Sequence, residues 1–571
     1  MESVVAGDEM IEEMRNVKRR KPGGWKSIPY ILGNETFERL ATFGVLANFQ
    51  VYLQTQFHMT LVAATNLINI WSGCANFAPL LGAFISDAYL GRFRTVAFAS
   101  IASLLGMGLL TFTAWSPKLH PPKCTPQQLK LNQCLGPTPC QLSVLLGALA
   151  LLGIGTGGIR PCSVPFALDQ FDTTTEQGRS DINSFFNWYF VSFTLVQMIA
   201  LTAVVYIQNS VSWVMGFGIP TGLMFGSIIL FFFGTRVYVC FKPEGSVFTD
   251  MGRVYAAAYK KRKVKLPDQT SVEGLYYDPP LQTDTIASKL PLTNEFRMLN
   301  KAALITNGEL SDEGVPNNKW RLCSIQQIEE AKCMLKIIPI WGSGIIYFIS
   351  MSQQGTLTVA QAMKMDRKLG PKFKIPPGAV SIISMITVGV FIPIHDRFLI
   401  PVSRQITRLE GGITVLQRIG IGLVFSLSST IVAGLVEAHR RETANAHNFT
   451  DGASPMSVMW LAPQLILMGL AEAFNIIGQM EFYSKQFPEN MKSIANSLTW
   501  ATMGGANYLS STIIMIVHAT TGKHGHPAWV SNNINGGRVN YLYYIISVLG
   551  LFNMLYFLVV ARRYQYKAGT M

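Results

Sequence analysis

Long apolar runs separated by short polar connections dominate the pattern of this chain. Twelve runs are long enough to cross a bilayer as helices, since a span needs about 20 predominantly apolar residues. The polar stretch 241–331 divides them into two sets of six. They fall at 30–53, 61–86, 95–115, 141–168, 184–207, 212–240, 332–352, 376–400, 414–436, 457–482, 494–518 and 541–561. The pattern predicts an all-α membrane protein built from two six-helix bundles.

The same pattern divides the chain into five segments. These are an N-terminus at 1–28, a bundle at 29–240, a central loop at 241–331, a bundle at 332–562 and a tail at 563–571. Lys and Arg concentrate in the connections that share a side with the N-terminus, which predicts cytoplasmic termini and a cytoplasmic central loop. The basic loop at 364–374 opposes this bias. Residues 1–28 are polar and basic, so no cleavable signal peptide is expected.

Composition supports a membrane protein and excludes several other classes. Only 14% of the 571 residues are charged, against about 25% in soluble domains. The net charge of +14 lies mostly between the apolar runs, which suits an anionic leaflet of the lipid bilayer better than nucleic acid. The histidines show no metal-ligand spacing, and the spans contain no nucleophile–base pair. We therefore expect neither an enzyme, nor a metal protein, nor a nucleic-acid partner.

Three ionisable residues, Glu35, Glu38 and Arg39, lie within the first apolar run. Their spacing places all three on one face of a helix. Charges inside a membrane usually face a water-filled path and carry function. Two carboxylates one turn apart repel each other, so one is expected to hold a proton while Arg39 pairs with Glu35. The group predicts a proton-coupling site; the alternative is that these charges mark the cytoplasmic entry of the helix.

Two predicted outside loops carry candidate modification sites. The first contains Cys124, Cys134 and Cys140, and an oxidising exterior would allow one disulfide among the three. Their spacing matches no zinc site. The second contains Asn448 at the start of an Asn-Phe-Thr glycosylation sequon.

The central loop contains an amphipathic stretch, Val254 to Lys263, which ends in a basic cluster. We interpret it as a short helix that lies on the membrane surface or braces the bundles. The alternative is a solvated basic face.

Several motifs resemble those of a known transporter family. The run from Gly82 to Arg92 resembles the loop signature of the major facilitator superfamily. Together with Glu35-x-x-Glu38-Arg39, it narrows the resemblance to the proton-coupled oligopeptide transporters. The long central loop is similar to that of the plant nitrate/peptide transporter branch. Further runs resemble a subfamily that includes nitrate transporters and carriers of glycosylated specialised metabolites: Lys21 to Trp25, Gly33 to Thr36 and Lys319 to Cys323.

The resemblance implies a major facilitator fold and secondary active transport by alternating access. Protons and a small-molecule substrate would be the partners, and the proton gradient would replace any cofactor. Glu35, Glu38 and Arg39 would form the proton-coupling triad. Arg160 stands where the family usually has a lysine that pairs with the acid matching Glu472. Because arginine cannot realistically deprotonate, a neutral-lysine mechanism is in doubt here, whereas an Arg160–Glu472 gate is retained.

The substrate expectation depends on Met351, which falls where well-studied nitrate transporters have a histidine. Methionine offers no N–H donor. A glycosylated specialised metabolite is therefore favoured, with low-affinity proton-coupled nitrate transport as the alternative. A receptor role without transport also stays open. The expected pocket lining is Phe185, Trp188, Tyr189, Trp341, Tyr347, Met351, Gln353 and Asn475.

Regulation and location follow from the resemblance alone. Thr95 matches a threonine that is phosphorylated in some nitrate-transporting members, which would make a regulatory kinase a partner. A plain helix start is the preferred interpretation of Thr95. The expected location is the plasma membrane, with the vacuolar membrane as the alternative.

Overall fold

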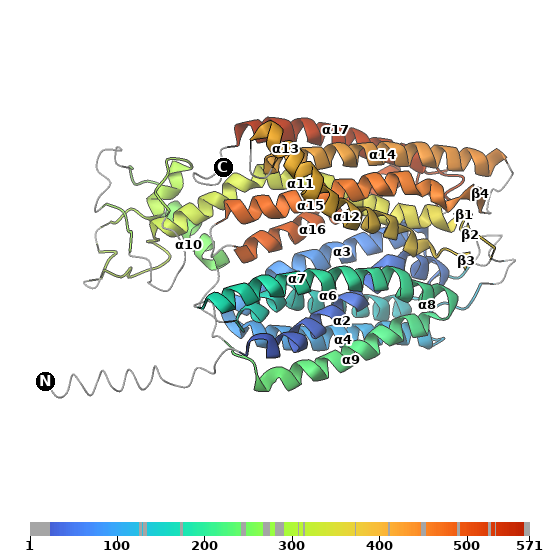
Figure 1. The fold of residues 1–571 in the computed structure, drawn as a ribbon, viewed down its shortest axis with the longest axis horizontal. Helices are drawn as coiled ribbons and strands as arrows, with labels where there is room; N and C mark the ends of the chain where they lie inside the picture. Colours follow the sequence, from blue (N-terminus) through green and yellow to red (C-terminus); the bar gives the residue numbers. More distant parts are fainter. Residues whose placement is uncertain are drawn as a thin grey trace.

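The computed structural model describes most of the chain. The described residues are 23–124, 128, 134–171, 175–240, 247–266, 275–279, 290–306, 308–311, 314–371, 373–408, 412–446, 453–487, 492–522, 527–531 and 533–564. Long helices run side by side through most of this length (Figure 1).

The first half contains six helical segments of membrane-spanning length. They are α2 (Ile28–Thr55), α3 (Leu61–Ile85) with η2 (Ser86–Leu90), α4 (Arg92–Trp115), α6 (Pro139–Leu168), α7 (Glu176–Ile199) with η3 (Ala200–Val204) and α8 (Val205–Ser210), and α9 (Trp213–Phe233). The short helices η1 (Gly24–Lys26) and η4 (Gly234–Arg236) flank them.

The second half repeats this plan after the loop helices α10 (Val247–Lys260) and η5 (Arg297–Ala302). Its helices are α11 (Ile325–Met363), η6 (Pro377–Ser381) with α12 (Ile382–Ile394), η7 (His395–Leu399) and α13 (Ile400–Thr407), α14 (Val415–Ala446), η8 (Val458–Leu461) with α15 (Ala462–Gln486), α16 (Lys492–Thr521) and α17 (Val539–Arg563). Two-residue strands β1 (Met365–Asp366), β2 (Lys368–Leu369) and β3 (Phe373–Lys374) follow α11. β2 pairs with β3, and β1 pairs with β4 (Ser454–Ser457).

Ten helical segments of the described chain are long and apolar enough to cross a membrane. This confirms the expected all-α membrane fold class. The other two expected spans, at 30–53 and 494–518, form α2 and α16, which have 28 and 30 residues. At 1.5 Å per residue each exceeds about 40 Å, more than the roughly 30 Å hydrocarbon layer. The count of twelve spans therefore rests on length for α2 and α16, and on length plus composition for the others.

Local sequence signals explain where several helices begin. The hydroxyl of Thr60 accepts a hydrogen bond from the Ala63 amide at the start of α3. Thr138 with Gln141 closes a capping box at α6, and Ser324 with Gln327 closes another at α11. Each box satisfies backbone amides that the first helical turn leaves without partners.

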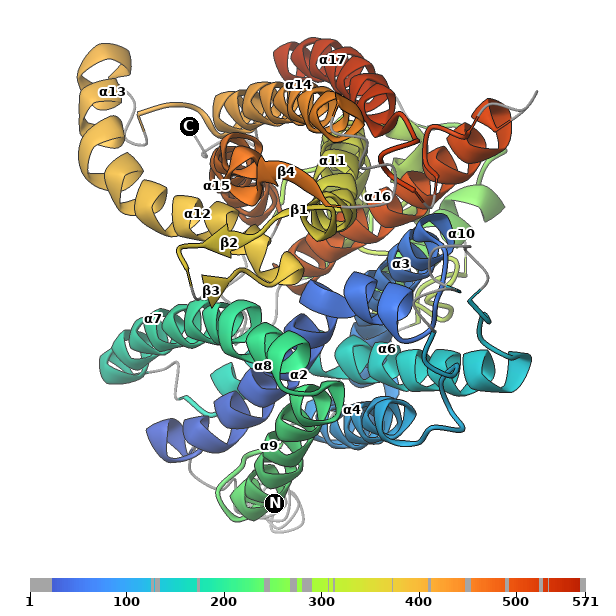
Figure 2. The same ribbon diagram turned by 90° about the vertical axis from the view of Figure 1, so that its right-hand side faces the viewer.

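The two halves form separate groups of helices that meet along α3 and α16 (Figures 1 and 2). Small residues permit the close approach. A Cβ added to Gly73 of α3 would lie 2.9 Å from the ring of Tyr508 on α16, and one added to Gly504 would lie 2.7 Å from Phe77. A Cβ at Gly378 of η6 would lie 2.3 Å from the Ala47 carbonyl oxygen of α2. The first two contacts join the middle parts of α3 and α16, and the third joins α2 to η6, which follows β3.

Residues 254–260 of the amphipathic stretch form the C-terminal part of α10, residues 261–263 follow as a turn, and the stretch packs against the protein itself. Val254 and Ala257 are fully buried in a cluster with η5 and the start of α11, including Ile328. Lys261 forms an ion pair with Glu309 at 2.6 Å. The apolar face of α10 is thus covered, which favours the bracing interpretation over insertion into the membrane surface.

Candidate functional site

The face of α2 that carries the predicted triad is buried against α7. Arg39 donates to Glu35 Oε1 through Nη2 at 2.5 Å and through Nε at 3.0 Å. The Tyr189 hydroxyl of α7 donates to the same oxygen at 3.1 Å and accepts from Arg39 Nη2 at 2.5 Å. The guanidinium also lies 4.7 Å from the ring centroid of Phe193. Glu35 is therefore held as one half of a hydrogen-bonded ion pair with aromatic cover.

Glu38 has a different environment although it lies one turn away. The Thr42 hydroxyl donates to its Oε1 at 2.8 Å. Its Oε2 is buried and has no hydrogen-bond partner in the described residues. Burying a carboxylate oxygen that accepts no hydrogen bond is costly when the group is ionised. Glu35 is paired with Arg39, whereas Glu38 forms no ion pair in the described residues, so Glu38 is the carboxylate for which burial opposes ionisation more strongly.

Arg160 on α6 reaches across to the second half of the protein. Its Nη1 donates to Asn76 Oδ1 at 3.4 Å, and its guanidinium carbon lies 5.0 Å from the ring centroid of Trp500 on α16. Glu472 on α15 forms no ion pair with Arg160, or with any other basic residue in the described ranges. In this conformation the predicted Arg160–Glu472 pair is not formed, and the Arg160 guanidinium packs over the ring of Trp500 instead.

A cavity of about 310 Å³ lies between the two halves. The first half contributes residues of α2, α3, α7 and η3 to its lining. The second half contributes residues of α11, η6, α12, α15 and α16. The lining residues are Phe43, Leu46, Ala47, Gln50, Ile68, Asn69, Ser72, Gln197, Leu201, Met351, Ser352, Gln354, Gly355, Thr356, Val359, Ser381, Ser384, Met385, Leu465, Met468, Glu472 and Asn507.

Amides, hydroxyls and apolar groups make up almost all of this lining. Glu472 is the single ionisable side chain among the described lining residues. Ser352 donates to Asn507 Oδ1 at 2.7 Å and reaches Asn69 Oδ1 at 3.2 Å, which joins α11, α16 and α3 at the cavity wall. The cavity thus offers neutral hydrogen-bonding groups and one acid.

One of the eight residues expected to line the pocket lines this cavity. Met351 lines the cavity, but the other seven side chains lie elsewhere. Trp188 is 61% exposed on the outside of α7, and Tyr189 belongs to the Glu35–Arg39 pair. The remaining five pack within the bundles: Phe185, Trp341, Tyr347, Gln353 and Asn475.

Packing between helices sets the rotation of each helix about its axis. This rotation decides which side chains face the cavity, and the sequence alone does not give it. Gln353 donates to the Ser510 carbonyl at 3.1 Å, whereas its neighbours Ser352 and Gln354 face the cavity. The lining polar residues that the sequence analysis missed include Gln50 and Asn69. Their only signal was an amide within an apolar run.

The superfamily loop signature forms a compact ionic contact at the ends of α4 and α6. Arg92 donates to Asp169 Oδ1 at 2.5 Å. Burial raises the pKa of Asp169, and the nearby positive charge of Arg92 opposes this effect. Thr95 lies one turn further along α4, where it is 6% exposed and donates to the Gly91 carbonyl at 3.0 Å. A buried, bonded Thr95 favours the interpretation as a helix start over that as a kinase site.

The outside cysteines divide into a pair and a free thiol. Cys124 and Cys134 form a disulfide, whereas Cys140 is free and exposed. The predicted sequon at Asn448 lies outside the described residues.

Comparison with known proteins assigns the family. Residues 93–530 match the POT family model. The Arabidopsis thaliana protein NRT1/PTR FAMILY 2.13 is 54% identical over 96% of this chain and 88% of its own length. NRT1/PTR FAMILY 2.12 of the same plant is 49% identical over 98% of this chain and 95% of its own.

Solved structures show the same fold. An auto-inhibited POT family peptide transporter matches with a TM-score of 0.69 at 18% identity, over 96% of this chain and 98% of its own. The POT family transporter PepTSo matches with a TM-score of 0.67 at 18% identity, over 95% and 98%. POT family transporters are not enzymes, and they use the proton gradient and no cofactor. This chain belongs to the POT family of membrane transporters, in its plant NRT1/PTR branch.

Proposed function

We propose that this transporter couples proton movement to the passage of a neutral glycosylated metabolite, with the central cavity as the binding site. The observation that carries the proposal is the lining: amides and hydroxyls together with a single acid, Glu472, among the described residues. Low-affinity proton-coupled nitrate transport is the second candidate, because the motifs at Lys21 to Trp25, Gly33 to Thr36 and Lys319 to Cys323 resemble a subfamily that includes nitrate transporters.

The lining favours a polyol over a small anion on electrostatic grounds. A desolvated anion needs a positive partner or several concentrated donors. Arg39 is paired with Glu35, and Arg160 lies over Trp500; neither side chain lines the cavity. Among the described lining residues, nitrate would face the acid Glu472 and no basic side chain. A sugar, in contrast, presents hydroxyls that both donate to and accept from amides.

The apolar part of the lining suits the aglycone, the portion of a glycoside that is not sugar. Phe43, Met351, Leu465 and Met468 offer an aromatic face, aliphatic surface and flexible thioethers. A volume of about 310 Å³ lies at the lower end of the range of roughly 300–1,000 Å³ for small-molecule sites. A small glycoside with an apolar aglycone matches a lining that has both hydrogen-bonding and apolar side chains.

Paired uptake measurements test the proposal. Oocytes expressing the protein are placed in acidic medium with labelled nitrate, neutral glycosides or anionic glycosides in parallel. We expect proton-dependent accumulation of neutral glycosides that exceeds that of nitrate. Strong proton-dependent nitrate uptake without glycoside accumulation, by import or by an export assay, would reverse the choice.

A cavity variant adds a selective arm to that experiment. Asn507→Leu removes a lining amide whose Oδ1 accepts from Ser352, so glycoside affinity should fall roughly tenfold, as expected for the loss of one or two hydrogen bonds. Asn209→Leu is the matched control, since Asn209 is exposed on α8 outside the cavity. Equal affinities of the two variants would place the ligand elsewhere.

We also propose that Arg160 and Glu472 pair in another state of the transport cycle. They lie on helices of opposite halves, and Glu472 has no basic partner in the described residues of this state. Arg160→Gln or Glu472→Gln alone should slow transport, and exchanging the two charges should partly restore it. A double neutral variant that transports at the wild-type rate would refute this pairing.

A further inference from the structure

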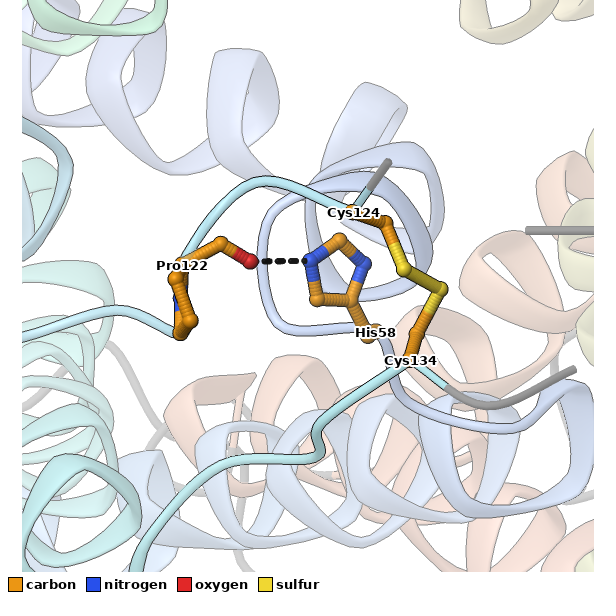
Figure 3. Close-up of a disulfide and its surroundings, with 4 residues drawn as sticks. All are labelled: His58, Pro122, Cys124 and Cys134. Carbon is orange, nitrogen blue, oxygen red and sulfur yellow. Dashed lines mark hydrogen bonds between the residues drawn. A yellow bond between two sulfur atoms is a disulfide. The ribbon is translucent and has the colours of Figure 1, made fainter. Parts of the chain in front are cut away.

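The turn between α2 and α3 places a histidine beside the outside disulfide. His58 occupies a left-handed backbone conformation, with φ of 50°, in this short connection. Its Nε2 lies 3.1 Å from the Pro122 carbonyl oxygen. In Figure 3 the imidazole lies between that carbonyl and the Cys124–Cys134 bond, with Nδ1 on the side of the sulfur atoms.

The hydrogen bond to Pro122 fixes which nitrogen is free. A carbonyl oxygen only accepts, so in neutral His58 the proton resides on Nε2 and Nδ1 keeps its lone pair. A backbone carbonyl that orients the second ring nitrogen is the arrangement typical of metal-ligating histidines. Sequence spacing could not show this cluster, because His58 lies 66 positions before Cys124.

The ligand atoms of His58, Cys124 and Cys134 all lie within 4.8 Å of one another, and the three residues are half-buried. We propose that reduction of the Cys124–Cys134 bond converts this cluster into a three-ligand site for a thiophilic divalent cation such as Zn²⁺. Two thiolates and one imidazole are ligands that Zn²⁺ prefers, with water completing a tetrahedron. Partial exposure gives both reductant and metal access.

The chemistry balances with a small thiol as reductant. Two thiol molecules of the glutathione class reduce the bond, are themselves oxidised to one disulfide, and leave Cys124 and Cys134 as thiols. On binding Zn²⁺ both thiols release their protons to solvent. The metal would then tie the α2–α3 turn to the connection between α4 and α6, which the His58–Pro122 hydrogen bond joins in the described part of the oxidised protein.

Cobalt binding to the full-length protein in detergent tests the proposal, since Co²⁺ replaces Zn²⁺ and gives thiolate charge-transfer bands. We expect one Co²⁺ per chain after reduction with a phosphine, displacement by Zn²⁺, and no such band in untreated protein. Cys124→Ser with Cys134→Ser should abolish the signal. His58→Ala keeps both thiols, and it should weaken binding by roughly tenfold or more and shift the d–d bands.

Cys140→Ser and His120→Ala are matched controls, because they change a free cysteine and a second histidine in the same outer region. Both should bind like the wild type. Unchanged affinity and spectrum in His58→Ala would overturn the assignment even if the double serine variant does not fold. Equal binding by untreated and reduced protein would overturn the dependence on reduction.

Discussion

Glu38→Gln is expected to reach the membrane as a folded protein and to lose uptake driven by a pH gradient. The Glu38 side chain keeps its shape in this variant, and the amide can still accept from Thr42. What is lost is a carboxylate whose buried Oε2 has no partner in the described residues. If that oxygen carries the coupled proton, gradient-driven uptake should fall below about a tenth of the wild-type rate.

Two measurements separate coupling from binding in this variant. Gradient-driven uptake is compared with exchange of labelled for unlabelled substrate at equal pH on both sides, which needs no net proton movement. We expect exchange to persist while gradient-driven uptake is lost. Glu442→Gln, which changes an exposed carboxylate on α14, is the control for surface expression. Full gradient-driven uptake by Glu38→Gln at normal surface abundance would refute the proposed role.

Glu35 is ion-paired and Glu38 is not in the described residues, and the sequence shows the reason only in part. The i, i+4 spacing predicts the pair with Arg39, and the structure contains that pair. The Tyr189 hydroxyl, which bonds both partners, lies 154 residues from Glu35. No local pattern identifies such a contact, because it depends on how α7 packs against α2. The choice of Glu38 over Glu35 as the proposed proton carrier therefore depends on the fold and not on the sequence pattern alone.

The fold itself was largely predictable because its signal is local. A helix within a bilayer must satisfy its own backbone, so a long apolar run has few alternatives. The cavity lining was much less predictable, since rotation of each helix depends on packing against its neighbours. Ser352 and Gln353 illustrate the limit: adjacent polar residues on α11, of which one faces the cavity and the other is bonded within the bundle.

The central loop shows a related limit. The apolar face of the stretch from Val254 was equally compatible with a lipid surface and with a protein surface. Hydrophobic periodicity defines such a face but not what covers it. Here η5 and the extended start of α11 cover it.

Arg440→Met is expected to destabilise the second bundle strongly, although Arg440 lies outside both the cavity and the triad. Arg440 and Glu437 on α14 are both fully buried. Arg440 donates to Glu437 through Nε at 2.7 Å and through Nη2 at 2.8 Å, and its Nη1 donates to Asn535 at 2.6 Å. Gln361 of α11 donates to Glu437 Oε2 at 2.8 Å. Removing one partner leaves a buried charge unpaired, which costs about 3–5 kcal/mol.

A double variant distinguishes loss of the ion pair from loss of volume. Arg440→Met with Glu437→Leu removes both charges, so it should recover part of the stability lost in Arg440→Met alone. Arg441→Met is the matched control, because Arg441 follows directly and forms no ion pair in the described residues. The unfolding midpoint in detergent measures all three. An Arg440→Met midpoint equal to that of Arg441→Met would contradict the expectation. A double variant less stable than Arg440→Met would show that packing, and not the unpaired carboxylate, dominates the loss.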